Sequence, residues 1–177
     1  TNRGSRLNEG REHGDEGKIP IRESPMSSIE YQCIEGLPEP RVIGGLAQLN
    51  QEIFGFNETE EILTQLFEEQ STVLICLAFR EGQTVGYKIG FGESRGSLES
   101  WRGGVAETAR QQGIARTLMQ MQHRWCEERG YRVIKTTTNG DNGPMLSLNL
   151  QSGFQIVGTF VNRRGRLKVL QEKWLSP

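Results

Sequence analysis

Three consecutive β-strand patterns between residues 71 and 105 constrain the fold more than any other feature of the chain. The first, STVLICLAFR at 71–80, is a nearly continuous apolar run, as expected of a strand that is covered on both faces. The turn EGQ leads into TVGYKIGF at 84–91, and the turn GESRGS leads into LESWRGGV at 98–105. Because short turns join antiparallel neighbours, these residues predict the antiparallel centre of a covered sheet.

Helix and strand patterns on either side complete the set of elements. Before residue 71, apolar spacing predicts a strand at 29–36 and helices at 41–54 and 58–70. After residue 105, the patterns predict helices at 114–130 and 145–152 and strands at 131–138, 154–161 and 167–175. A chain of 177 residues has room for one domain with a sizeable core. The order of the elements therefore predicts a single-domain, mixed α/β fold on a central sheet.

Charge and hydropathy exclude several classes of protein. The net charge is −1 and the pI is near 6.2, so we expect no nucleic-acid partner. No apolar run approaches the roughly 18 residues of a membrane-spanning helix, so we expect no membrane association. Residues 1–18 have almost no apolar side chains, which predicts a disordered tail rather than a signal peptide, followed by a domain at 19–177.

The cysteines and histidines show no metal-binding pattern. Cys33, Cys76 and Cys126 are odd in number and scattered, and His13 and His123 lie far apart. We therefore expect no metal site, and we expect the cysteines to be reduced thiols in a cytoplasmic protein.

The segment RQQGIA at 110–115 lies where a turn opens into the helix expected at 114–130. Backbone N–H groups in the first turn of a helix have no internal partners, and the helix dipole favours an anion there. Gly113 would let a phosphate approach the main chain, and Arg110 and Arg116 would add positive charge. A glycine in front of a helix is also an ordinary turn residue, so spacing alone leaves both interpretations open.

Two motifs carry a resemblance to a known family. VAETARQQGIARTL at 105–118 resembles motif A of the GNAT superfamily of acyl-CoA-dependent N-acetyltransferases, whose core is Arg/Gln-x-x-Gly-x-Gly/Ala. NGPMLSLNLQSGF at 142–154 is similar to a later motif of the same family. The resemblance covers the chain from about residue 29 to the C-terminus. It implies a GNAT-type fold, in which a mixed, mostly antiparallel central sheet is flanked by helices.

The resemblance also implies acetyl-CoA as co-substrate and a place for each of its parts. In this family the loop of motif A binds the pyrophosphate on backbone N–H groups, and the pantetheine arm lies where two adjacent strands splay apart. A free N–H near Val105 would polarise the thioester carbonyl. Asn142 would hold the pantetheine or order the following loop, or it is an ordinary turn residue. The expected cofactor-binding residues are Gly104, Val105, Arg110, Gln111, Gln112, Gly113, Ile114, Ala115, Arg116 and Asn142.

A carboxylate is needed to remove the proton of an acceptor ammonium. Glu99 lies eleven residues before Arg110, where some family members resemble this chain by carrying a glutamate base. A solvent-facing surface acid is the alternative, and Glu107, in the loop, is a poorer candidate for the base. Strand alternation places Glu99 on the face opposite Arg102, unless a bulge near the glycines changes the parity.

The position at which many family members carry the tyrosine that protonates the leaving thiolate is Asn149 in this chain. An amide has no useful acidic proton, so the thiolate takes its proton from water or another group, or Asn149 only hydrogen-bonds the sulfur. Trp101 is expected in the core, with the acceptor pocket as the alternative.

These features predict an N-acetyltransferase that moves an acetyl group from acetyl-CoA to a primary amine of a small molecule or peptide by direct attack. Asn149 favours an alternative, a catalytically silent acyl-CoA-binding regulatory module. A homodimer through the terminal strands is plausible, and the acceptor is not identified by any residue pattern.

Overall fold

Seven strands form one sheet in the order β1-β2-β3-β4-β5-β7-β6 in the computed structural model, which describes residues 28–93 and 96–175. The strands span Glu30–Glu35 (β1), Val73–Arg80 (β2), Gln83–Glu93 (β3), Ser97–Val105 (β4), Val133–Asn139 (β5), Gln155–Val161 (β6) and Leu167–Trp174 (β7). The helices span Pro40–Phe54 (α1), Glu60–Glu68 (α2), Ile114–Glu128 (α3) and Gly143–Gln151 (α4). All strand pairs are antiparallel except β4–β5.

This arrangement confirms the predicted mixed α/β fold with a mostly antiparallel sheet. The tail expected at 1–18 and the domain boundary at 19 lie outside the described residues, so the domain limits stay a prediction.

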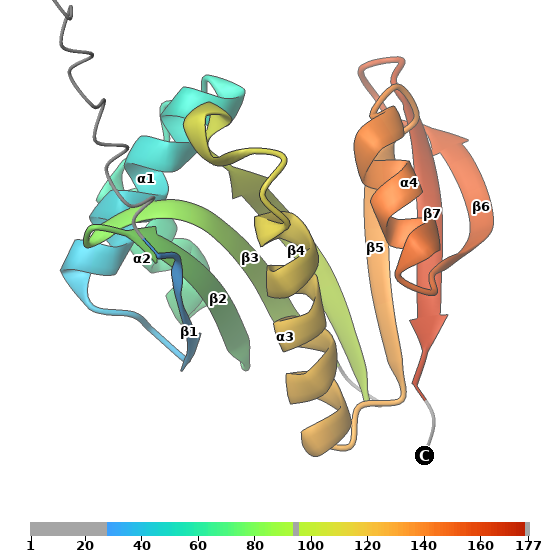
Figure 1. Ribbon diagram of the computed structural model, residues 1–177. Coiled ribbons are helices and arrows are strands. Elements are labelled where there is room, and N and C mark those ends of the chain that lie inside the picture. Colours follow the sequence, from blue (N-terminus) through green and yellow to red (C-terminus); the bar gives the residue numbers. More distant parts are fainter. Residues whose placement is uncertain (1–27, 94–95, 176–177) are drawn as a thin grey trace, which may run out of the picture.

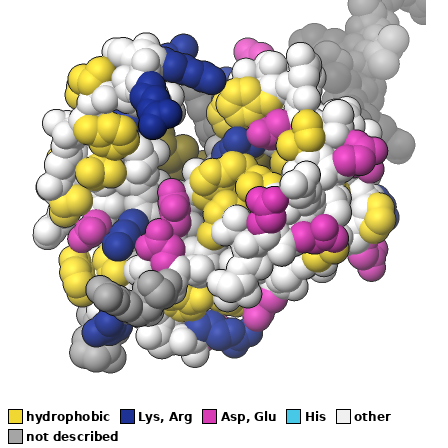
Figure 2. Space-filling model, turned by 180° about the vertical axis from the view of Figure 1, so that it is seen from behind, with side chains coloured by type: hydrophobic (Ala, Val, Ile, Leu, Met, Phe, Trp, Pro, Cys, Tyr) yellow, Lys and Arg dark blue, Asp and Glu magenta, His cyan; other side chains and the backbone are white. Residues whose placement is uncertain are grey.

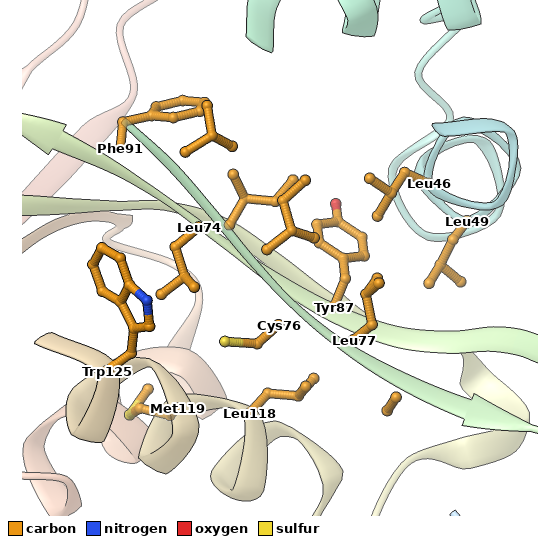
Figure 3. Close-up of a cluster of buried hydrophobic side chains, with 14 of the residues drawn as sticks. Leu46, Leu49, Leu74, Cys76, Leu77, Tyr87, Phe91, Leu118, Met119 and Trp125 are labelled. Carbon is orange, nitrogen blue, oxygen red and sulfur yellow. The ribbon is translucent and has the colours of Figure 1, made fainter. Parts of the chain in front are cut away.

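Helices cover both faces of the sheet, as Figure 1 shows. We call the face covered by α1 and α2 the α1 side, and the face covered by α3 and α4 the α3 side. Leu74 and Cys76 of β2 point toward α3, whereas Leu77 points toward α1 together with Tyr87 of β3 (Figure 3). The first six residues of β2 are buried, which confirms the prediction of a strand covered on both faces.

Capping side chains set two helix starts that periodicity placed differently. The Thr59 side chain accepts a hydrogen bond from the backbone N–H of Ile62, so α2 begins at Glu60. Asn142 caps α4, which therefore begins at Gly143, two residues earlier than the apolar pattern predicted.

A β-bulge in β4 rearranges its side chains. Ile89 of β3 pairs with Arg102, and Gly90 pairs with Ser100, so Trp101 is the extra residue. The bulge lies before the glycines rather than at them. It places Arg102 on the α1 side together with Glu99, so the expectation that strict alternation would separate these two residues is wrong.

Candidate active site

The sheet splits between its two parallel strands. β4 and β5 pair only at Ser97, Leu98 and Glu99, opposite Val133, Ile134 and Lys135. Figure 1 shows the two strands diverging beyond this point. From Trp101 to Val105, β4 has β3 on one side, but no strand among the described residues pairs with it on the other. We call this open edge the β4–β5 split. Its main chain offers hydrogen-bonding groups to an extended ligand.

The loop after β4 leads directly into the N-terminus of α3. A single 3₁₀ turn at Glu107–Ala109 follows the strand, and Gly113 is the N-cap residue of α3. Gly113 has φ +78°, a left-handed conformation that favours glycine, and a side chain there would meet no atom within 4 Å. The glycine is therefore favoured by the backbone conformation and also leaves open space in front of the first helical N–H groups.

Three arginines surround this helix N-terminus. The Arg110 Nε donates to the carbonyl of Val105 at 3.2 Å, and Arg116 donates to Gln151 of α4 at 2.9 Å. Arg80, at the end of β2, donates to Gln112 Oε1 at 2.6 Å. Within residues 28–93 and 96–175, none of the three forms an ion pair with a carboxylate. Their charge therefore adds to the helix dipole in favouring an anion at this position.

Asn142 and Asn149 lie at opposite ends of α4. Asn142 is exposed, and its Oδ1 accepts from the N–H of Met145 at 3.1 Å, so its observed contact orders the helix start. Asn149 is 1% exposed and donates to Gln171 Oε1 at 2.8 Å and to Thr138 Oγ1 at 3.2 Å. The Asn149 amide thus ties α4 to β5 and β7, and it brings no acidic proton to the split.

Glu99 lies at the closed end of the split, on the α1 side and half-buried. Burial raises the pKa of its carboxyl, the negative charge of Glu93 raises this pKa further, and Lys135 opposes the shift. A carboxylate with a raised pKa, at the point where the two strands separate, has the properties of a general base.

Aromatic side chains cover the α1 side of the split. A side chain at Gly104 would come within 2.7 Å of Ile53, at the end of α1. Phe54 and Phe56 stack with ring centroids 5.1 Å apart. The Arg102 guanidinium lies 4.9 Å from the Phe56 ring centre and is held by Glu58 at 2.6 Å. An apolar, partly aromatic wall therefore faces the open edge of β4.

Most of the residues expected from sequence surround the mouth of the split. Gly104 and Val105 end its open edge, and the loop residues 110–113 and the start of α3 follow immediately. Asn149 lies behind this region, in the interior of the molecule. Sequence reasoning missed Arg80, whose only signal was a basic residue at the end of an apolar strand, and missed Lys88, a buried lysine of β3.

No cluster of three or more histidine, cysteine, aspartate or glutamate side chains that could bind a metal is present among residues 28–93 and 96–175. None of the described helices is long and apolar enough to cross a membrane.

The fold and the split sheet form an α/β domain with an open strand edge for an extended ligand. The profile described as "Acetyltransferase (GNAT) family" matches residues 42–154, which is more than half of the chain. The chain belongs to this family, and it is an acyltransferase that uses acetyl-CoA as donor.

Solved structures with the same fold include several N-acetyltransferases. The ribosomal-protein-alanine N-acetyltransferase from Brucella melitensis is 25% identical, with a TM-score of 0.66 over 80% of this chain and 99% of that one. The ribosomal-protein-S18-alanine N-acetyltransferase from Escherichia coli is 14% identical, with a TM-score of 0.69 over 82% and 96%. The PaiA N-acetyltransferase from Thermoplasma acidophilum, solved with coenzyme A, is 14% identical, with a TM-score of 0.67 over 84% and 99%. No curated protein sequence gives a significant match.

Proposed function

We propose that this protein transfers the acetyl group of acetyl-CoA to a primary amine of a small molecule or a peptide, by direct attack of the amine on the thioester. The observation that carries the proposal is the continuity of the β4–β5 split with the positively charged N-terminus of α3. This geometry offers one continuous path for a ligand with an extended arm at one end and phosphates at the other.

The donor is bound by main chain and by arginines. The pyrophosphate accepts hydrogen bonds from N–H groups of the loop 110–116, with Arg80 and Arg110 nearby. The pantetheine arm pairs with the open edge of β4 at Gly104 and Val105, as an added strand would. A backbone N–H at this edge then stabilises the negative charge that develops on the thioester oxygen.

The acceptor amine approaches from the α1 side, where Glu99 and the aromatic wall lie. Figure 2 shows this face, with hydrophobic side chains interspersed among acidic and basic ones. Glu99 takes the ammonium proton, directly or through water, and the neutral amine attacks the carbonyl carbon. The Brucella relative acts on an alanine of a ribosomal protein by its name, so peptides with a free N-terminal alanine are the first acceptors to test.

The terminal strands support a homodimer. β6 is an edge strand, and Ile156, Val157, Phe160 and Val161 are all more than 40% exposed. No other described strand pairs with the outer edge of β6, and such an uncharged edge favours pairing with a second copy. Sedimentation or light scattering measures the oligomeric state of the wild type and of Val161→Lys. If both proteins are monomers, the homodimer proposal is wrong.

The function is tested in two stages. Calorimetric titration with acetyl-CoA, coenzyme A and dephospho-coenzyme A measures donor binding. Thiol release is then followed with a panel of peptide and small-molecule amines. Binding with turnover supports the proposal, whereas binding without turnover on every acceptor class would favour the silent acyl-CoA-binding module. Absence of binding would contradict both.

A further inference from the structure

A group of polar side chains, all buried except the half-buried Lys173, lies on the α3 side, beneath α3. We call Lys88, Ser100, Gln122, His123 and Lys173 the buried polar cluster. Lys88 is 8% exposed, Ser100 3%, Gln122 0% and His123 6%. These residues come from β3, β4, α3 and β7, so only the tertiary fold brings them together.

The cluster spans the β4–β5 split from both sides. Lys173 of β7 contacts His123 Nδ1 at 2.9 Å. Lys88 of β3 approaches from the opposite half of the sheet, and its positive charge also acts on His123. β4 and β5 separate β3 from β7 in the sheet order, so the two lysines converge over the strands that form the split.

Gly103 of β4 lies beside Lys88 of β3. Gly103 pairs with Lys88 and faces the same side because of the bulge at Trp101. A side chain at Gly103 would lie 3.5 Å from Lys88 Cγ. Because residue 103 is a glycine, no side chain at this position of β4 crowds the Lys88 side chain.

Several polar atoms of the cluster are buried without a partner. Ser100 Oγ, both polar atoms of the Gln122 amide and His123 Nε2 form no hydrogen bond, and neither does Gln171 Nε2 nearby. Among residues 28–93 and 96–175, no carboxylate forms an ion pair with Lys88 or Lys173. Buried donors without an acceptor are costly, as is a buried cation without an ion-pair partner. An anionic group from a ligand would accept from Ser100 Oγ, Gln122 Nε2 and His123 Nε2, whereas Gln122 Oε1 is itself an acceptor and would need a donor.

We propose that the buried polar cluster receives the leaving sulfur of coenzyme A, and that the Lys88 ammonium protonates this sulfur. This inference rests on the proposed function and names a further catalytic residue for it. The bond from the acceptor nitrogen to the acyl carbon forms, this nitrogen loses one proton to water, and the carbon–sulfur bond breaks with its electron pair on sulfur. The Lys88 ammonium gives one proton to the thiolate and becomes a neutral amine, which water then protonates again.

The electrostatics agree with this role. Burial lowers the pKa of Lys88 to about 8, which is near the usual value of a thiol. Proton transfer between groups of similar pKa is favourable for catalysis. The charged or titratable groups that face Lys88 are Cys76 of β2 and His123 of α3, with Lys173 beyond it. His123 stays neutral at physiological pH, because burial, Lys173 and Lys88 together lower its pKa to about 3.

The experiment measures the ionisation of bound coenzyme A and needs no acceptor. The ultraviolet absorbance of the thiolate is recorded against pH for the protein with coenzyme A, minus the protein with desulfo-coenzyme A. The variants are Lys88→Met and Lys88→Gln, with Lys168→Met as a control on the opposite face of the sheet. The Lys168 Nζ donates a hydrogen bond to Asn139 Oδ1. By strand alternation along β7, the Lys168 side chain lies on the face opposite that of Val169, Gln171 and Lys173.

For wild type and Lys168→Met, we expect the midpoint of the bound thiol to lie no more than about 1 pH unit below that of free coenzyme A, so that the Lys88 ammonium can still protonate the thiolate. For both Lys88 variants, we expect the midpoint to return to the free value or to rise above it. If the Lys88 variants bind coenzyme A with the wild-type midpoint, Lys88 does not contact the sulfur, although the proposed function stands. If wild type binds no coenzyme A at all, the proposed function itself fails.

Discussion

Trp101 and Arg102 are adjacent in sequence, yet their side chains lie on the same side of β4, with the Arg102 guanidinium 4.0 Å from the Trp101 ring centre. Neighbours in a regular strand point to opposite faces, and the bulge at Trp101 removes this alternation. One extra residue thus places the Arg102 side chain on the α1 side of β4, the same side as Glu99. The same residue turns Gly103 toward Lys88 on the α3 side.

Acetyl-CoA is expected to raise the melting temperature of the protein, because a ligand that binds only the native state stabilises it. At a ligand concentration of 100 Kd the stabilisation is about 2.7 kcal/mol. Differential scanning fluorimetry across a series of acetyl-CoA concentrations measures the shift. A folded sample that shows no shift at millimolar ligand would contradict donor binding.

Gly113→Ala is expected to weaken coenzyme A binding more than Gly130→Ala does. Both glycines have a left-handed backbone, with φ +78° and +73°, and neither has an atom within 4 Å of a new side chain. Both substitutions therefore carry similar strain, on the order of 1 kcal/mol, but only residue 113 precedes the N-terminus of α3. Titration calorimetry compares the affinities. Equal affinities would place the pyrophosphate elsewhere.

Glu99→Gln is expected to keep donor affinity and to lower kcat/KM by about 10²–10⁴. Because the carboxyl pKa is raised, wild-type activity should fall with decreasing pH at a higher pH than for an ordinary carboxyl. The Gln variant should lack this limb, and its deficit should shrink at high pH, where the amine is already neutral. A pH–rate profile of both proteins tests this. Equal rates of the wild type and the Gln variant at every pH would show that Glu99 is a surface acid and not the general base.

Lys88→Met is expected to stabilise the protein at neutral pH, by on the order of 1–3 kcal/mol, because it removes a buried charge that has no ion-pair partner in the described part of the chain. Folding lowers the pKa of Lys88. At pH values between its folded and unfolded pKa, the unfolded chain therefore binds one more proton than the folded chain. Wild-type stability should therefore rise relative to the variant as the pH increases from about 8 to the ordinary lysine pKa. Urea unfolding at several pH values measures the difference. A variant less stable than wild type at pH 7 would show that the ammonium has a structural partner.

The three thiols should react at different rates. Cys33 is exposed, and a hydrogen bond from Cys76 lowers its pKa, whereas burial raises the pKa of Cys126 to about 12. A thiol reagent should therefore modify one cysteine in the native protein and all three after unfolding. Cys33→Ser should abolish the native reaction. A persistent fast reaction in that variant would show that a buried thiol is accessible.

The sequence predicted the helices, strands and motifs better than it predicted the side of the sheet on which each side chain lies. The apolar run of β2, the returning strands and the amphipathic α3 were found because burial repeats at a fixed period along each element. Alternation failed beyond Ser100, since a bulge depends on how two strands pair and leaves no mark in the spacing of apolar residues. The cysteines also looked scattered, whereas Cys33 and Cys76 lie opposite each other across β1 and β2, with their sulfurs 3.0 Å apart.

By itself, the sequence determined the order of the elements and the family motifs, because these properties are local to short segments. Only the tertiary structure decided which side chains meet. Lys88 and Lys173 are 85 positions apart in the sequence, and both act on His123 because β3 and β7 lie on either side of one split. Long-range strand order sets such contacts, and no local periodicity records it.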